Sequence, residues 1–326
     1  MKFHKKFFLI NKNIRKSKVL TILIVIIITN QICIKNDIIS YNKEFRVCLC
    51  TLGKKENRYI REFVEHYKNY GVDKIYLYDN NDINGEKFEE VINDYIKNGF
   101  VEIINFRGKI RPIYQIMNNC YSRNYKNYSW LIFYEMDEFI YLKDFTDIKL
   151  FLKDKRFNNC QKVQLNWGFH TDNNLLHYDN RSLKVRFPEI SPELKGKKTN
   201  GPMGIKTIVR GNISELKIIC IHTINKMLKA CDGFGNPKKY LGIVNDISDL
   251  EYYYIDHFYS KSTEEFIDKL NKGDALYKDN RLTRIKTYFF LNKITKEKID
   301  YFENSTGLNL SQFKKILKQN NSGFNL

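Results

Sequence analysis

Two acidic side chains, Glu135 and Asp137, stand two residues apart directly after the apolar run 130–134. Carboxylates with this spacing at a strand end can share a divalent cation, and Mg²⁺ or Mn²⁺ held by one or two carboxylates completes its shell with phosphate oxygens of a substrate. Such a cation stabilises the negative charge that grows on a departing nucleotide. A solvated acidic turn is the alternative, because acidic triplets are common.

Polar side chains also follow two other apolar runs. Asp79, Asn80 and Asn81 come after one run, and Arg107 comes after the next. In open α/β sheets, ligands bind outside the carboxyl ends of the strands. We therefore expect these side chains at the same edge as the acidic pair. The alternative for the first three residues is that they cap a turn.

The elements that must position these residues follow from the apolar periodicity, which alternates between strand and helix patterns. This βαβαβαβ order predicts a doubly wound, mostly parallel sheet with helices on both faces. A C-terminal helical portion begins near residue 260, and 187–204 is predicted to be a long loop. The predicted strands are 45–51, 74–78, 100–106 and 130–134, and the predicted helices are 57–70, 88–97, 113–125, 263–271 and 296–301.

The chain before this domain divides into three parts. Residues 1–18 carry seven basic and no acidic side chains, 19–34 are apolar with few interruptions, and 35–44 form a polar linker. As a helix, 19–34 would reach about 24 Å, short of a hydrocarbon core of about 30 Å. We predict a single-pass anchor with a cytosolic N-terminus in a secretory-pathway or cell-envelope membrane, and a globular domain 45–326. A cleaved signal peptide is the alternative, although no cleavage site follows.

The composition suits a globular protein, with 43% apolar and 28% charged residues. A formal net charge of +18 is compatible with nucleic acid, an anionic membrane or a phosphorylated substrate. The chain has no long run of arginines and aromatic residues of the kind that follows a nucleic-acid strand. Nucleic acid is therefore not an expected partner.

The seven cysteines lack the CxxC spacing of a zinc site or a redox pair. We interpret them as buried free thiols, with Cys48 and Cys50 facing the same side of a strand. Only Cys220 and Cys231 are expected to be able to pair. Free thiols conflict with a location across the membrane, because such compartments oxidise thiols.

Several longer motifs resemble those of glycosyltransferase family 92 and its bacterial family 2-like relatives. The resemblance is densest over 47–142 and extends over most of the chain after residue 45. The resembling motifs are Lys55-Glu56-Asn57-Arg58-Tyr59-Ile60, Glu65-His66-Tyr67, Gly71-Val72-Asp73, Tyr76-Leu77-Tyr78-Asp79-Asn80-Asn81, Asp137-Glu138-Phe139, Asn166-Trp167, Asp172-Asn173-Asn174, His222-Thr223, Cys231-Asp232, His257-Phe258-Tyr259, Lys261-Ser262 and Lys272-Gly273-Asp274.

The resemblance implies a GT-A fold, a nucleotide-diphosphate sugar donor, a glycan or other hydroxyl acceptor, and Mn²⁺ or Mg²⁺ at an Asp-x-Asp motif. Asp137 matches the second acid of that motif, and Glu135 stands at its first position. Asp79 matches the acid near the donor's nucleoside, while Glu56 and Arg58 match the first loop. Asn80, Asn81 and Arg107 complete the expected donor contacts.

The resemblance also suggests roles for side chains in the second half of the chain. His222 and His257 are expected as further metal ligands or diphosphate contacts, and Lys261 as a cation near the leaving group. Trp167 is expected to stack on an acceptor sugar, and Asp172 to act as general base in an inverting reaction. Ordinary core or surface positions are the alternatives for the histidines and for Trp167.

Two positions depart from the pattern of these relatives. Ile113 and Asn119 stand where such relatives often carry Gln and Asp. Together with Glu135, they leave open a catalytically silent protein that binds nucleotide or glycan.

Overall fold

The structure is a computed structural model, and Arg46–Leu326 forms one compact unit in it. The basic tail 1–18 and the predicted anchor 19–34 lie outside the described residues, as does nearly all of the linker. Within the described ranges, no helix has both the length and the apolar character that crossing a bilayer requires. The described residues are 44–191, 203–238, 244–245, 250–273, 276 and 281–307.

The first half of the sheet consists of four parallel strands in the order β3-β2-β1-β4. This confirms the predicted parallel βαβαβαβ arrangement, with boundaries that shift by one or two residues. The first strand runs two residues further than predicted, because Leu52 and Gly53 pair with Tyr78 and Asp79. The strands are β1 (Val47–Gly53), β2 (Lys74–Asp79), β3 (Val101–Asn105) and β4 (Trp130–Phe133).

The second half of the sheet is mixed, so the prediction of a mostly parallel sheet holds only for the first half. From β4 the order continues β7-β6-β11-β5, and only β6 and β11 run parallel within it. Apolar periodicity carries no information on strand direction, which pairing across the sheet decides. The strands are β5 (Glu138–Leu142), β6 (Lys162–Phe169), β7 (Met203–Arg210) and β11 (Tyr253–His257), with short β8 (Ala230–Cys231), β9 (Pro237–Lys238) and β10 (Val244–Asn245) off this path.

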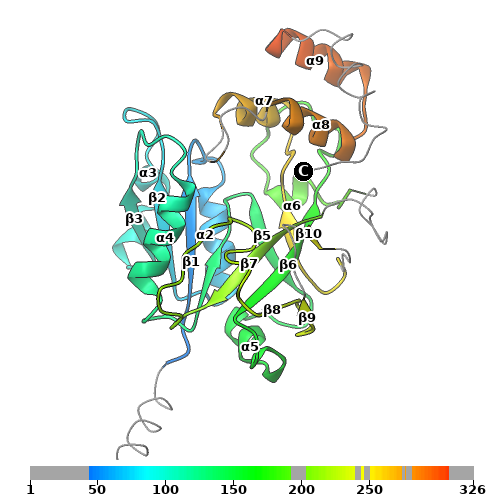
Figure 1. Cartoon of the computed structure of the whole chain (residues 1–326). Helices are drawn as coiled ribbons and strands as arrows, with labels where there is room; N and C mark the ends of the chain where they lie inside the picture. Colours follow the sequence, from blue (N-terminus) through cyan, green and yellow to red (C-terminus); the bar gives the residue numbers. More distant parts are fainter. Residues whose placement is uncertain are drawn as a thin grey trace, which may run out of the picture. The chain divides into compact units, whose positions relative to one another are not determined.

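Helices cover both faces of the parallel half, as predicted (Figure 1). Helix α4 (Ile113–Asn124) packs on the face that carries Cys48 and Tyr78. Phe88, just before α3 (Glu89–Lys97), lies against Gly53 on the opposite face, and α2 (Ile60–Asn69) pairs with α3 through Arg61 and Asp94. The side on which helices pack therefore changes between β1 and β4. This is the topological switch point at which open α/β sheets bind ligands.

Three further helices form the predicted C-terminal helical portion. They share an apolar cluster that includes Phe266, Tyr288 and Phe302. Lys272, which follows the first of them, donates a hydrogen bond to the carbonyl of Lys54 after β1. The end of α7 therefore lies at the carboxyl edge of the parallel strands, and Figure 1 shows α8 beside it and α9 farther out. The helices are α7 (Thr263–Asn271), α8 (Arg281–Leu291) and α9 (Lys296–Thr306); α5 (Ile148–Lys153) and α6 (Leu183–Arg186) come earlier in the chain.

Two disulfides correct the interpretation of the cysteines as free thiols. Cys50 of β1 is bonded to Cys120 of α4, and Cys160 is bonded to Cys231. The predicted pair of Cys220 and Cys231 is wrong, because β8 pairs with β6 and brings Cys231 to Cys160 instead. Cys48 and Cys220 are free thiols, and Cys33 lies outside the described residues.

Candidate functional site

Three side chains with metal-binding atoms converge where β4, β5 and β11 meet. One ligand atom each of Asp137, Glu138 and His257 lies within 4.8 Å of the other two. The sheet creates this group, because β11 runs antiparallel to β5 and pairs His257 directly with Glu138. All three residues are buried. Two carboxylates and one imidazole form a donor set suited to Mn²⁺ or Mg²⁺.

Glu135 is not part of this group, although the sequence paired it with Asp137. The turn after β4 is closed by a hydrogen bond from the Glu138 amide to the Glu135 carbonyl, at 3.0 Å. The side chain of Glu135 is 38% exposed and lies 3.7 Å from the ammonium of Lys206. Glu138 was missed because neighbouring residues in a strand face opposite sides, and the turn breaks that alternation.

Cations surround the two carboxylates of the group. The Lys269 ammonium lies 2.6 Å from Asp137 Oδ2, and His257 Nε2 lies 3.6 Å from the same oxygen. Burial acts to raise the pKa of Asp137, but Lys269 and His257 outweigh it and hold that pKa well below its ordinary value. Burial raises the pKa of Glu138 to about 8, although Lys206 lies only 3.4 Å away.

Two atoms of the group have no hydrogen-bond partner in the part of the chain that the structure describes. They are His257 Nδ1 and Glu138 Oε1, and the latter has only the ammonium of Lys206 near it, at 3.4 Å. A buried polar atom without a hydrogen bond costs free energy, so such atoms are exceptions that call for an explanation. A bound cation at this position would give Glu138 or His257 a partner.

His222 and Trp167 lie beside the acidic group. The Trp167 ring centroid is 4.4 Å from that of His257 and 5.1 Å from that of His222. His222 Nδ1 lies 3.0 Å from the carbonyl oxygen of Ile205, and burial lowers its pKa to about 3. Trp167 packs so closely on Gly204 that any Cβ there would overlap its ring. Trp167 thus contacts both histidines, His222 and His257.

Glu56, predicted to contact the donor, lies between two lysines at the start of the β1–α2 loop. Its carboxylate contacts the ammonium of Lys272 and lies 3.5 Å from that of Lys261. Lys261 also lies 3.3 Å above the centroid of the Tyr59 ring. Its backbone is left-handed, with φ of 53°, which is unusual for a residue with a side chain. Strained positions of this kind are frequent at functional sites.

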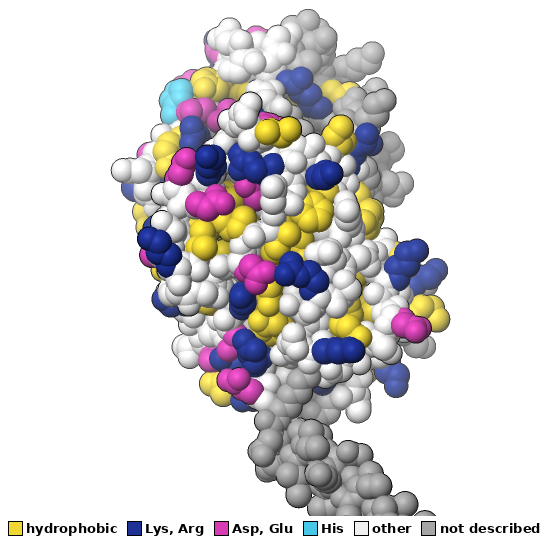
Figure 2. All heavy atoms as spheres, turned by 90° about the vertical axis from the view of Figure 1, so that its left-hand side faces the viewer, with side chains coloured by type: hydrophobic (Ala, Val, Ile, Leu, Met, Phe, Trp, Pro, Cys, Tyr) yellow, Lys and Arg dark blue, Asp and Glu magenta, His cyan; other side chains and the backbone are white. Residues whose placement is uncertain are grey.

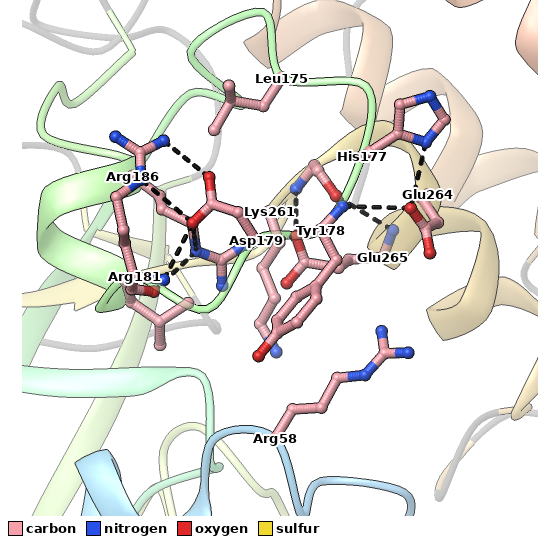
Figure 3. A network of polar contacts seen from close by, with 12 residues as sticks. Arg58, Leu175, His177, Tyr178, Asp179, Arg181, Arg186, Lys261, Glu264 and Glu265 are labelled. Carbon is pink, nitrogen blue, oxygen red and sulfur yellow. Dashed lines mark hydrogen bonds and ion pairs between the residues drawn. The ribbon is translucent and has the colours of Figure 1, made fainter.

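Arg58 lies at the edge of a second polar network, which includes Arg186 and Glu265 (Figure 3). Its guanidinium lies 4.6 Å from the centroid of the Tyr178 ring and 3.6 Å from the Asp268 carboxylate. The side chain is 47% exposed, so it remains accessible to a ligand. Behind it, Arg186 and Glu265 form a fully buried ion pair at 2.7 Å.

Asp79 lies at the carboxyl end of β2, where the sequence placed it, but its carboxylate is already paired. Arg107 Nη1 lies 2.5 Å from Asp79 Oδ2, and the same guanidinium donates hydrogen bonds to the carbonyls of Asp82 and Gly85. The pair therefore holds the loop after β2. The two asparagines serve similar ends: Asn80 donates to the Lys109 carbonyl, and Asn81 accepts from the Lys55 amide.

A small pocket of about 10 Å³, room for a single water molecule, lies at the switch point between β1 and β4. Glu135 and Lys206 form part of its polar wall. Thr51 and Tyr134 also line it, and both carry buried hydroxyls without a hydrogen-bond partner among the described residues. Lys206 links this pocket to the acidic group. The other lining residues are Cys50, Leu52, Ile113, Ile116, Met117, Phe133 and Ile221.

Asp172, the predicted general base, lies in a different environment. Its carboxylate pairs with the ammonium of Lys298 at 2.7 Å and accepts a hydrogen bond from the Tyr288 hydroxyl at 2.5 Å. The side chains of Asp172 and Lys298 are 2% and 1% exposed. The carboxylate is enclosed by protein groups in this structure, and the general-base role of Asp172 stays a prediction. The residue also anchors α8 and α9 to the loop after β6.

The model of glycosyltransferase family 92 matches residues 43–306 of the chain. The chain belongs to glycosyltransferase family 92. A family 92 protein of Oryza sativa subsp. japonica is 27% identical over 110 residues, which is 31% of this chain and 18% of the rice protein. The match thus spans less than a fifth of that relative's length. The family assignment agrees with the resemblance in the motifs.

Solved structures of S. aureus TarS are distant from this family 92 chain. The structure of TarS residues 1–349 in complex with UDP-GlcNAc has a TM-score of 0.37 and 12% identity, over 81% of this chain and 80% of that chain. A longer TarS structure has a TM-score of 0.35 and 14% identity, over 81% of this chain and 48% of that one. Similarity at this level carries no argument about the fold or the ligands of the family 92 chain.

Proposed function

We propose that the protein transfers a sugar from a nucleotide-diphosphate donor to a hydroxyl group of a glycan or another acceptor. The observation that carries this proposal is the match of the family 92 model over residues 43–306. The site supports it, because a pocket at the switch point adjoins buried carboxylates, an imidazole and lysines. A nucleotide donor fits such an edge, where strand ends present polar groups to a ligand.

The donor's nucleoside is proposed to bind over the carboxyl ends of β1 and β4, the edge at which such sheets bind ligands. Its diphosphate then extends past Lys206 toward Asp137, and the lysines that line this path balance the phosphate charge. Lys206 contacts both Glu135 and Glu138, so it stands between the pocket and the acidic group. Cations fixed in a buried site stabilise the charge of the leaving diphosphate without reorganisation during the reaction.

Mn²⁺ or Mg²⁺ is proposed as the cofactor, held by Asp137, Glu138 and His257. The residues fit such an ion, because two carboxylates and an imidazole converge there and His257 Nδ1 is buried without a hydrogen-bond partner in the described chain. A bound divalent cation would supply Lewis-acid stabilisation to the departing diphosphate. Glu135 is assigned a contact at the pocket wall through Lys206 instead of a ligand position.

Trp167 is proposed to form part of the acceptor subsite. Its ring contacts His257 and is only partly buried, and its indole N–H has no hydrogen-bond partner among the described residues. The flat apolar face of an indole suits stacking on a sugar ring. His222 also contacts this indole, in an edge-to-face arrangement.

A screen of nucleotide sugars by thermal shift, with and without Mn²⁺, tests the donor class. A donor that binds the folded protein raises Tm, by an amount that grows with the logarithm of its concentration over Kd. Release of nucleoside diphosphate from that donor, with and without candidate glycan acceptors, then measures turnover. The proposal fails if no nucleotide sugar shifts Tm and none is hydrolysed or transferred.

A second candidate is a catalytically silent protein that binds nucleotide or glycan. The ion pair of Asp137 with Lys269 favours it, because an ammonium already lies where a catalytic cation would bind. Calorimetric binding of a nucleoside diphosphate with no turnover of any donor would distinguish this candidate.

The predicted attachment to a membrane through 19–34 remains a proposal, and those residues lie outside the described part of the chain. The two disulfides favour an oxidising compartment, which removes the conflict that free thiols posed. Lysine and arginine side chains are interspersed with acidic ones on the face shown in Figure 2, which gives no support for a nucleic-acid partner. Protease protection of the globular domain in sealed membranes would test the topology.

A further inference from the structure

Lys269 lies on the oxygen of Asp137 to which a cation would bind. Its ammonium is 2.6 Å from Asp137 Oδ2 and 3.2 Å from the carbonyl oxygen of Tyr259. The side chain is 17% exposed, so the ammonium is largely withdrawn from water. An ammonium so placed is a stand-in for a metal ion, with one positive charge instead of two.

The other acids around the group are paired with lysines in the same way. Lys206 lies within 4 Å of Glu135 and Glu138, and Lys272 contacts Glu56. A divalent ion added to this balanced set would face nearby ammonium groups, and like charges repel strongly where water is scarce. It would also need the oxygen that Lys269 holds, because Mn²⁺ and Mg²⁺ bind carboxylate oxygens at about 2.1 Å.

A nucleoside diphosphate changes this balance. Its phosphates bring negative charge next to the acidic group, and a displaced ammonium can donate its hydrogen bonds to phosphate oxygens. Only the side chain of Lys269 has to move. Helix α7, which carries it, is fixed by the capping box of Ser262 and Glu265 and by the ion pair of Glu265 with Arg186. The four-carbon stem of lysine allows such a reorientation.

We propose that Lys269 competes with the divalent cation for Asp137, so that the metal binds weakly alone and tightly together with a nucleoside diphosphate. Lys269 is thus a positioning residue that couples the two ligands and then neutralises part of the phosphate charge. The inference rests on the proposed function, because that function supplies the diphosphate. By linkage, the metal must strengthen nucleotide binding by the factor by which the nucleotide strengthens metal binding.

The test is a titration of the full chain with Mn²⁺, in which the electron paramagnetic resonance signal measures the concentration of the free ion. Each titration is made alone and with UDP or GDP as the probe. We expect either nucleotide that binds to tighten Mn²⁺ binding to the parent by about 10-fold or more, within the range usual for such couplings. Lys269→Gln should bind Mn²⁺ alone about 10-fold more tightly than the parent, and its coupling to nucleotide should fall below about threefold.

Two variants serve as controls. Lys269→Arg keeps the positive charge and should keep metal binding weak without nucleotide. Lys149→Gln removes an ammonium from another lysine–aspartate pair, that of Lys149 with Asp73 at 3.0 Å, which lies outside the site. It should bind Mn²⁺ as the parent does. Circular dichroism establishes that each variant is folded before titration.

The inference is overturned if Lys269→Gln and the parent bind Mn²⁺ alone with equal affinity, or if Lys149→Gln gains as much affinity as Lys269→Gln. It is also overturned if no form binds Mn²⁺ while nucleotide still binds. Failure of the proposed function gives a different pattern: neither probe binds any form, yet Lys269→Gln still gains affinity for Mn²⁺. That pattern would support competition between Lys269 and the metal, and it would contradict the proposal that a nucleoside diphosphate binds at this site.

Discussion

Two buried aspartates in this protein each pair with a lysine from the C-terminal helical portion. Asp137, after β4, lies 2.6 Å from Lys269 of α7, and Asp172, after β6, lies 2.7 Å from Lys298 of α9. Both aspartates were predicted from the sequence to act in catalysis. The distances are nearly the same, so the ion pair itself does not distinguish a site from a structural contact.

The surroundings of the two pairs differ. Lys298 donates to Asp172, to the Asn174 side chain and to the Lys293 carbonyl, while Tyr288 donates to Asp172. All of these groups find partners inside the protein. Near Asp137, by contrast, buried atoms of His257 and Glu138 lack hydrogen-bond partners within the described residues. A closed network stabilises the fold, whereas an incomplete one leaves room for a ligand.

The largest expected effect is a loss of stability when the ion pair of Asp172 with Lys298 is broken. Lys298→Met leaves the Asp172 carboxylate buried without its cation, which should lower the free energy of unfolding by about 3–5 kcal/mol. Urea unfolding of the variant and the parent measures this. Adding Asp172→Asn removes the uncompensated charge and should recover part of the loss. A change below about 1 kcal/mol in the single variant would mean that the pair is not a structural anchor.

Breaking the ion pair of Asp137 with Lys269 should lower activity instead of stability. Asp137→Asn should lower kcat for release of nucleoside diphosphate by about 100-fold or more, a cost of at least about 2.7 kcal/mol in the transition state. Its thermal unfolding should change little, because Lys269 keeps the carbonyl of Tyr259 as a partner. The comparison uses Asp172→Asn, assayed below its Tm. If that variant loses as much activity per folded molecule as Asp137→Asn, the distinction between the two aspartates fails.

A third buried acid, Glu265, sharpens the comparison through pH. Burial acts to raise its pKa, but hydrogen bonds from Arg186, Ser262 and Tyr59 outweigh it and lower that pKa below 4.5. A carboxyl group with a lowered pKa in the folded state stabilises the protein above its unfolded pKa, and this stabilisation is lost as the pH falls.

Glu265→Gln should therefore cost about 2 kcal/mol of stability at neutral pH, as expected for a hydrogen-bonded charged group. The difference from the parent should shrink as the pH falls below about 4.5. Urea unfolding at a series of pH values follows it. A difference that is the same at every pH would show that the charge of Glu265 does not contribute.

The smallest effect is expected for Glu135. Its carboxylate is partly exposed and 3.7 Å from Lys206, and exposed ion pairs contribute about 0–1 kcal/mol. Glu135→Gln should therefore lower kcat by less than about fivefold, and Glu138→Gln by much more. Parallel assays of donor turnover at saturating Mn²⁺ compare the two. The reverse order would return Glu135 to the ligand position that its place in the motif suggested.

Local sequence patterns predicted the first half of the domain closely. The helix α2 has Ile60, Phe63, Val64 and Tyr67 on its buried face, at a spacing that only a helix brings together. Asp79 and Asp137 were predicted to follow strands because each comes after a short apolar run. In this half, patterns among residues close in the chain are enough to locate the strands to within one or two residues.

The partners of these residues could not be predicted in the same way. Glu138 lies beside His257 because β5 and β11 pair antiparallel. The paired residues of these strands are 111 to 119 positions apart in the sequence. Lys269 and Lys298 come from helices far along the chain, 132 and 126 residues after the aspartates with which they pair. The cysteines show the same limit, because Cys160 meets Cys231 across 71 residues.

The sequence by itself thus determined the parallel half of the sheet, the edge at which polar groups gather and the family of the protein. These depend on residues close together in the chain. Only the tertiary structure decided which carboxylates share a site, which lysines neutralise them and which aspartate is closed off. Such contacts depend on strand direction and helix docking, which distant parts of the chain set together.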